Sequence, residues 1–154
     1  MAKPLAIKLY QNSPMFSDRY ADVKNPAELP NGSGYTFWRT SIEKIIDMVA
    51  SCAPNLIICG HVKDSALSEN ATNNLKTLDL TGKVSRILSA KSDAIGWVHR
   101  DEESNLCIQF GADGEVLTGA RPAHLANKDI IVAERNEDGT FTPHWDRIFP
   151  SLAN

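Results

Sequence analysis

The feature that most constrains the fold is the run NLIICGHV (residues 55–62), which comes directly after a helical pattern. In the preceding segment, residues 35–54, apolar residues recur three and four positions apart. This spacing predicts an amphipathic helix, capped by Ser33 upstream and ended by Pro54. A helix that leads at once into a continuously apolar segment of strand length is typical of a central strand covered on both faces. The pattern therefore predicts an α/β layered sheet with helices on its faces.

The C-terminal half changes to shorter elements. Residues 82–93 predict a short helix capped by Thr81, with Val84, Ile87 and Leu88 facing inward. The dipeptide Asp113-Gly114 is a strong hairpin signal between two alternating segments. Extended segments are predicted at 94–100, 105–110, 115–119, 129–135 and 140–149. The sheet should therefore give way to antiparallel hairpins toward the C-terminus.

The first 34 residues differ from the rest. Residues 4–12 fit either a strand or the end of a helix, and the next twenty or so residues form a connector rich in Pro and Gly. At 154 residues the chain has the length of one ordinary domain. We therefore expect a single domain, 1–154, with an N-terminal segment and connector at 1–34 and a core at 35–154.

Charge and cysteine content limit the function. A net charge of -3 argues against a diffuse polyanion-binding surface, although a local basic patch remains open. Cys52, Cys59 and Cys107 form no CxxC pair, and Cys59 lies in an apolar run, so a reduced, buried thiol is expected there. No apolar stretch approaches the roughly 20 residues of a membrane helix, and the N-terminus is too short and mixed for a signal peptide. These features predict a cytoplasmic protein.

Motifs with direct chemistry are scarce. LTGKVS resembles a phosphate-binding loop, but Thr77 stands where the first glycine is needed and Val84 replaces the hydroxyl that holds Mg²⁺. The histidines at 61, 99, 124 and 144 are not at metal-ligand spacing, so no metal site is predicted. No Ser/His/Asp set can be chosen from spacing alone.

Basic residues outnumber acidic ones between positions 63 and 91, which contain five lysines and arginines and three acidic residues. This local excess fits either a solvated surface loop or a loop that contacts nucleic-acid phosphates. The stretch contains no aromatic residue, so it lacks the stacking platform common in single-strand binders. The candidate nucleic-acid contacts are Lys63, Lys76, Lys83 and Arg86. Arg121 follows an alternating segment and is either a surface residue or an arginine that reaches a neighbouring subunit's phosphates.

The order of these blocks resembles a known family. LIICGHVKD, a polar loop, LDLTGKVSRILSAKSDAIGWVHR, a hairpin, GARPAHLANKD and WDRIF follow one another as in the C-terminal half of bacteriophage RecA-like P-loop NTPases. These are AAA-type ATPases grouped with Sak-type single-strand annealing recombinases. The resemblance extends from about residue 5 to residue 149. It implies a partial RecA-like sheet and a role in DNA recombination or replication in the host cytoplasm.

The resemblance also implies residue roles. In that family a strand beside the Walker B strand ends in a polar residue, often His or Gln, that senses the γ-phosphate and connects to a mobile loop facing DNA. His61 takes the sensor role, with Gly60 beside it at the nucleotide edge and residues 63–80 as the loop. Arg121 and Lys128 match the region that reaches across a subunit interface. Ligands of open α/β sheets bind at the carboxyl ends of strands, which suits His61.

The family's Walker A and Walker B segments are not in this sequence. The resemblance therefore implies ATP and Mg²⁺ binding only in a complete oligomeric assembly, with a Walker-bearing partner or N-terminal half and with single-stranded DNA as a further ligand. The chain would be a fragment, the product of a split gene, or a shortened descendant. The alternative is a non-catalytic regulatory protein that binds a full-length ATPase at its subunit interface. An unrelated α/β enzyme is a third hypothesis.

Overall fold

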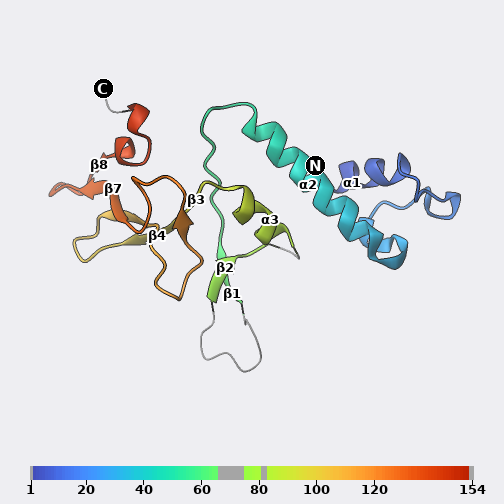
Figure 1. The fold of residues 1–154 in the computed structure, drawn as a ribbon, viewed down its shortest axis with the longest axis horizontal. Coiled ribbons are helices and arrows are strands. Elements are labelled where there is room, and N and C mark those ends of the chain that lie inside the picture. The colour runs from blue at the N-terminus through green and yellow to red at the C-terminus, as the bar shows by residue number, and fades with distance from the viewer. Residues whose placement is uncertain (1, 66–74, 81–82, 153–154) are drawn as a thin grey trace. The chain divides into compact units, whose positions relative to one another are not determined.

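The computed structural model describes residues 2–65, 75–80 and 83–152 (Figure 1). The protein is a mixture of helices and antiparallel sheets, which confirms the coarse fold prediction. It divides into two compact units, Met1–Gly60 with Leu80–Ile87 and His61–Asp79 with Leu88–Asn154. RecA-like layering and a single domain over 1–154 stay predictions.

Two helices dominate the first unit. Helices α1 (Ala2–Gln11) and α2 (Ser33–Ala50) pack against each other, so the helical alternative for residues 4–12 is the one observed. The connector between them forms short 3₁₀ turns, η1 (Asp18–Tyr20), η2 (Pro26–Glu28) and η3 (Pro30–Gly32). Ser41 in α2 is fully buried, and its hydroxyl lies within hydrogen-bond distance of two carbonyls, Trp38 of its own helix at 2.7 Å and Ala2 at the start of α1 at 3.0 Å.

The start of α2 differs from the prediction. Gly32, with φ of 67°, occupies the cap position, and Ser33 is the first helical residue, its hydroxyl donating to the carbonyl of Pro30. Gly34 is required by close packing, because a Cβ at this position would lie 1.5 Å from the carbonyl oxygen of Pro26. Glycines at these positions therefore let the connector fold against the first turn of α2.

The central strand predicted at 55–62 is not formed, and only its last residue, Val62, belongs to a strand, as the first residue of β1. Residues 53–61 have neither helix nor strand, and the side chains of Leu56, Ile57 and Ile58 are 40 to 57% exposed. The prediction was wrong because an apolar run becomes a central strand only where neighbouring strands accept its backbone hydrogen bonds. Within the described part of the chain, no strand pairs with this segment.

The second unit is built from antiparallel pairs. Strands β1 (Val62–Ser65) and β2 (Leu75–Leu78) form one ribbon, and β3 (Ala94–Ile95) pairs with β6 (Gly119–Ala120). A four-stranded sheet has the order β4-β5-β7-β8, composed of Trp97–Arg100, Leu106–Gln109, Asp129–Arg135 and Phe141–Pro143. The last described residues form the turns η4 (Trp145–Arg147) and η5 (Pro150–Leu152).

One face of the four-stranded sheet supplies the core of this unit. Phe110, Leu125, Val132 and Ile148 form the buried cluster, each no more than 8% exposed. Leu106, Ile108 and Ile130 pack against it from β5 and β7. Since successive residues of a strand point to opposite faces, the intervening residues of these strands lie on the other face.

The turn predicted at Asp113-Gly114 is present, but its expected hairpin is not. Gly114 has φ of 85°, and the Asp113 carboxylate accepts hydrogen bonds from the amides of Glu115 and Val116. The segment after the turn does not pair with β5, because β4 and β7 already occupy both sides of that strand. It pairs instead with β2, through hydrogen bonds from the Lys76 amide to the Glu115 carbonyl and from the Leu117 amide to the Lys76 carbonyl.

The Asp113 turn gives a pH dependence with a definite sign. Hydrogen bonds from the amides of Glu115 and Val116 lower the Asp113 pKa from its usual 3.8. A carboxyl with a lowered folded-state pKa contributes stability above its unfolded pKa and loses it as the pH falls through the folded value. Asp113→Asn keeps an oxygen acceptor but does not titrate. We expect its urea midpoint to fall less than that of the wild type between pH 5 and pH 2.

The control for this comparison is Glu102→Gln, an exposed position in another turn. Urea midpoints of the three proteins should be measured at half-unit pH intervals. Parallel pH profiles for wild type and Asp113→Asn would contradict the role given to the Asp113 carboxylate.

Two predicted extended segments are interrupted: 94–100 is divided into β3 and β4, which belong to different sheets, and in 140–149 only β8 is a strand before the 3₁₀ turn η4. Helix α3 (Val84–Lys91) has Val84 and Leu88 buried and Ile87 half-buried, as expected; its predicted cap, Thr81, lies outside the described residues. Cys59 is exposed, contrary to prediction, because the apolar run around it is not packed, whereas Cys107 is buried.

Among the described residues, no helix is both long and apolar enough to cross a membrane.

Candidate functional site

His61 lies immediately before β1, at the base of the β1–β2 ribbon. Its carbonyl accepts a hydrogen bond of 2.8 Å from the amide of Asp79, which closes the ribbon at this end. The residue is exposed, and within the described part of the protein its imidazole has no hydrogen-bond partner. The predicted sensor is thus joined directly to the segment predicted to contact DNA, of which residues 66–74 lie outside the described residues.

Two predicted nucleic-acid contacts lie on this ribbon. Lys63 is opposite Thr77 and forms a 3.2 Å ion pair with Asp79, while Lys76 is opposite Asp64. Because strand residues alternate between faces, Lys63 and Lys76 belong to opposite faces of the ribbon. The ribbon alone therefore does not gather these two charges into one patch.

The other predicted basic contacts are placed elsewhere. Lys83 precedes α3 and Arg86 lies in its first half, and both are exposed. They belong to the first compact unit, whereas Lys63 and Lys76 belong to the second.

Arg121 holds the C-terminal end of α3. Its guanidinium donates to the carbonyls of Ala90 and Ser92, both at 2.9 Å, and to the Asp93 carboxylate at 3.1 Å. A cation at a helix C-terminus is stabilised by the exposed carbonyls there. The structure therefore gives Arg121 a contact within its own chain, and its role toward a neighbouring subunit stays a prediction.

Lys128, the other predicted interface residue, follows a turn just before β7. Its amide donates to the Leu125 carbonyl and its own carbonyl accepts from the Phe110 amide at 2.7 Å. The residue is exposed. Gly60, the remaining predicted cofactor contact, is exposed in the irregular segment before His61.

A cluster that the sequence reasoning missed lies on the four-stranded sheet. The Nε2 atom of His99 is 3.0 and 2.9 Å from the two carboxylate oxygens of Asp129, and the ligand atoms of His99, Cys107 and Asp129 all lie within 4.8 Å of one another. Burial raises the pKa of the Cys107 thiol, and the nearby Asp101 and Asp129 carboxylates raise it further.

The missed cluster had a weak signal in the sequence. His99 and Cys107 stand in two adjacent alternating segments, but Asp129 is 22 residues further along the chain. Only the pairing of β5 with both β4 and β7 brings the three together. A search for closely spaced ligands could not have found them.

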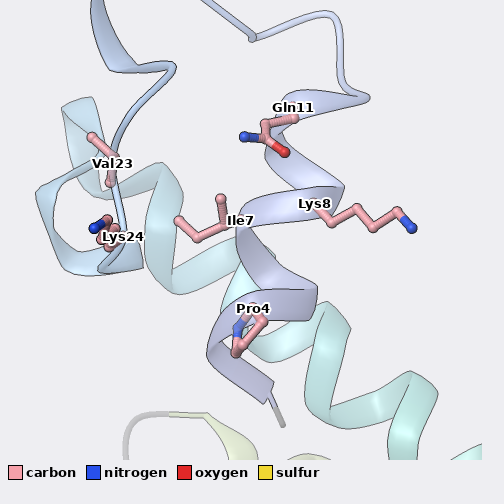
Figure 2. Close-up of a pocket in the computed structure, with 6 residues that line it drawn as sticks. All are labelled: Pro4, Ile7, Lys8, Gln11, Val23 and Lys24. Atoms are coloured by element: carbon pink, nitrogen blue, oxygen red, sulfur yellow. The ribbon is translucent and has the colours of Figure 1, made fainter.

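The first unit has a shallow depression on α1 and the connector (Figure 2). Figure 2 shows Ile7 pointing toward the segment that carries Val23 and Lys24, while Lys8 extends away from it. The lining residues are Pro4, Ile7, Lys8, Gln11, Val23 and Lys24. They include no carboxylate, histidine or cysteine, so no acid–base pair can be assembled from the residues that line this depression.

Comparison with protein-family models, curated proteins and solved structures found no match to this chain.

Proposed function

We propose that this chain is the C-terminal portion of a phage RecA-like ATPase that acts in DNA recombination or replication. The Walker A and Walker B motifs come from another polypeptide or from the N-terminal half of a longer chain. ATP and Mg²⁺ bind at the edge that the two parts share, and the chain contributes the γ-phosphate sensor and the DNA-facing loop. The proposal rests on the resemblance of the ordered sequence blocks together with one structural observation.

That observation is the exposure of residues 54–60, which form neither helix nor strand. The segment has the composition of a buried strand, yet Leu56, Ile57 and Ile58 are exposed. In the described part of the protein its backbone groups form no hydrogen bond. Unpaired peptide groups beside exposed apolar side chains readily add as a strand to the edge of another sheet. A segment whose neighbouring strands belong to the Walker-bearing part would have these properties.

Addition of residues 55–60 to a sheet of the Walker-bearing part would also place His61 for a role in ATP binding. If residues 55–60 join a parallel sheet, His61 stands at the carboxyl end of a strand, where ligands of open α/β sheets bind. A neutral imidazole donates one hydrogen bond, which suits a phosphate oxygen. The β1–β2 ribbon begins at the next residue, so a displacement of His61 toward the phosphate moves the base of that ribbon. Lys63 and Lys76 on the ribbon are then the candidate contacts with DNA phosphates.

Reconstitution tests the proposal. The frames encoded beside this chain should be searched for a polypeptide that carries G-x-x-x-x-G-K-[ST]. The 154-residue chain should then be mixed with that polypeptide, and Mg²⁺-dependent ATP hydrolysis measured for each chain alone and for both together. We expect hydrolysis only from the mixture, with a further rise when single-stranded DNA is added.

The control is a Walker-bearing partner whose motif lysine is replaced by alanine, which should associate but not hydrolyse ATP. Full hydrolysis by the partner alone, unchanged when this chain is added, would contradict the proposed role. Association accompanied by inhibition would favour the regulatory alternative.

A further inference from the structure

The outer face of the four-stranded sheet brings three kinds of metal-binding atom to one place. His99 on β4 is directly opposite Cys107 on β5, and Cys107 is opposite Ile131 on β7. Asp129 precedes Ile131 by two residues and so shares its face. Three neighbouring strands therefore direct an imidazole, a thiol and a carboxylate toward a common point.

We propose that His99, Cys107 and Asp129 bind one Zn²⁺ ion. The ligand atoms lie within 4.8 Å of one another, and His99 Nε2 and Asp129 Oδ2 are 2.9 Å apart. Ligand atoms around a tetrahedral zinc ion are separated by about 3.3 to 3.7 Å, given metal–ligand bonds of 2.0 to 2.3 Å. The three ligand atoms thus lie at separations close to those of a zinc site in the strand register observed.

The donor set selects the class of metal. Calcium and magnesium prefer all-oxygen ligands, whereas a nitrogen, a sulfur and a single carboxylate are the ligands of zinc. Zinc binding needs a thiolate at Cys107 and a free lone pair on His99 Nε2, so the contact between His99 Nε2 and the Asp129 carboxylate is replaced by bonds to the metal. Zinc binding at this site is therefore accompanied by release of a proton from Cys107.

The protein provides three ligands to the proposed zinc ion, His99, Cys107 and Asp129. Asp101, whose Oδ2 is 3.8 Å from the Cys107 sulfur, accepts hydrogen bonds from the side chain and amide of Asn105 and from the amide of Glu103. These contacts keep Asp101 in its turn and make it a neighbour of the site, not a ligand. His99 and Asp129 have side-chain exposures of 27 and 49%, whereas Cys107 is only 3% exposed. The fourth position therefore faces solvent and holds water.

A bound ion would connect three of the four strands. The sheet has its apolar cluster on the other face, so this face depends on the cross-strand pairs themselves. A ligand that binds only the folded state stabilises it by mass action. The site is thus inferred to stabilise the sheet, and this inference stands independently of the proposed ATPase role.

Cobalt binding tests the proposal. The full chain with Cys52→Ser and Cys59→Ser leaves Cys107 as the remaining thiol, since the two substituted cysteines are exposed. Co²⁺ should bind with one-to-one stoichiometry, produce a near-ultraviolet thiolate-to-cobalt band, and be displaced by Zn²⁺. The melting temperature should rise with added Zn²⁺.

Three variants in this background make the test specific. Cys107→Ser should remove the band, and Asp129→Asn and His99→Gln should each raise the zinc Kd at least about tenfold. Glu102→Gln, an exposed carboxylate outside the cluster, should leave the Kd unchanged. Far-ultraviolet circular dichroism checks that each variant is folded. Absence of a cobalt band in the parent, or a zinc Kd unchanged in both Asp129→Asn and His99→Gln, would overturn the proposal.

Discussion

Replacing His61 with alanine is expected to lower ATP hydrolysis by the reconstituted assembly about 100-fold or more, the usual cost of removing a group that donates to charge developing in a transition state. The folded chain should be unaffected. In the described part of the chain, His61 is hydrogen-bonded only through its backbone carbonyl, which accepts from the Asp79 amide. Alanine retains that carbonyl. Loss of activity with intact association is therefore expected.

The matched comparison is His61→Gln, which keeps a side-chain donor at this position. It should retain more hydrolysis than His61→Ala. Hydrolysis should be measured at saturating ATP, and association of the two chains by sedimentation. Normal hydrolysis by His61→Ala would rule out the sensor role, and loss of association would instead make His61 part of the contact.

Elements defined by local periodicity could be predicted from the sequence. The spacing of apolar residues in α2 and α3 places their apolar side chains on one face, and this pattern depends only on residues a few positions apart. The alternating segments that became β4, β5 and β7 were likewise recognisable. The first helix remained ambiguous because residues 4–12 are too few to distinguish the helical period of about 3.6 residues from the strand period of about 2.

Pairing could not be predicted in the same way. Asp113-Gly114 forms its turn from local hydrogen bonds, but the segment that follows it forms a single β-bridge with β2, which is distant in sequence. Residues 55–60 have the composition of a buried strand, yet burial depends on neighbours that the described chain does not provide. Composition specifies what a segment prefers, whereas the partners available decide whether that preference is met.

The candidate site residues likewise divide into those evident from local sequence and those brought together only by strand pairing. His61 leads within two residues into the segment predicted to contact DNA, and this connection is evident from the sequence alone. The roles given to His61 and Lys63 stay predictions. The cluster of His99, Cys107 and Asp129 depends on the strand order β4-β5-β7, including the register shift between Leu106 and Cys107. No spacing rule encodes that register, so the cluster becomes visible only in the folded sheet.

Tyr10→Ala is expected to be the most destabilising change in the helical unit. Tyr10 is 1% exposed, its ring contacts those of Phe16 and Phe37 at centroid distances of 5.7 and 5.6 Å, and its hydroxyl accepts a 3.0 Å hydrogen bond from the Ser17 amide. It thus joins α1, the connector and α2 at one point. Truncating a buried aromatic side chain costs about 3 to 5 kcal/mol. A helical pair of this size has little stability to spare.

Tyr10→Phe separates packing from hydrogen bonding. It keeps the ring contacts but leaves the Ser17 amide without its acceptor, at a cost of about 1 to 2 kcal/mol. Tyr35→Ala is the matched control, since Tyr35 on α2 is 63% exposed and its truncation should change stability by about 0.5 kcal/mol or less. Hydrogen exchange of the α1 and α2 amides should rank the variants as Tyr10→Ala, Tyr10→Phe and Tyr35→Ala, fastest first. Equal protection in Tyr10→Ala and Tyr35→Ala would mean that the helices are held together elsewhere, because loss of the buried ring would then have removed no contact on which their pairing depends.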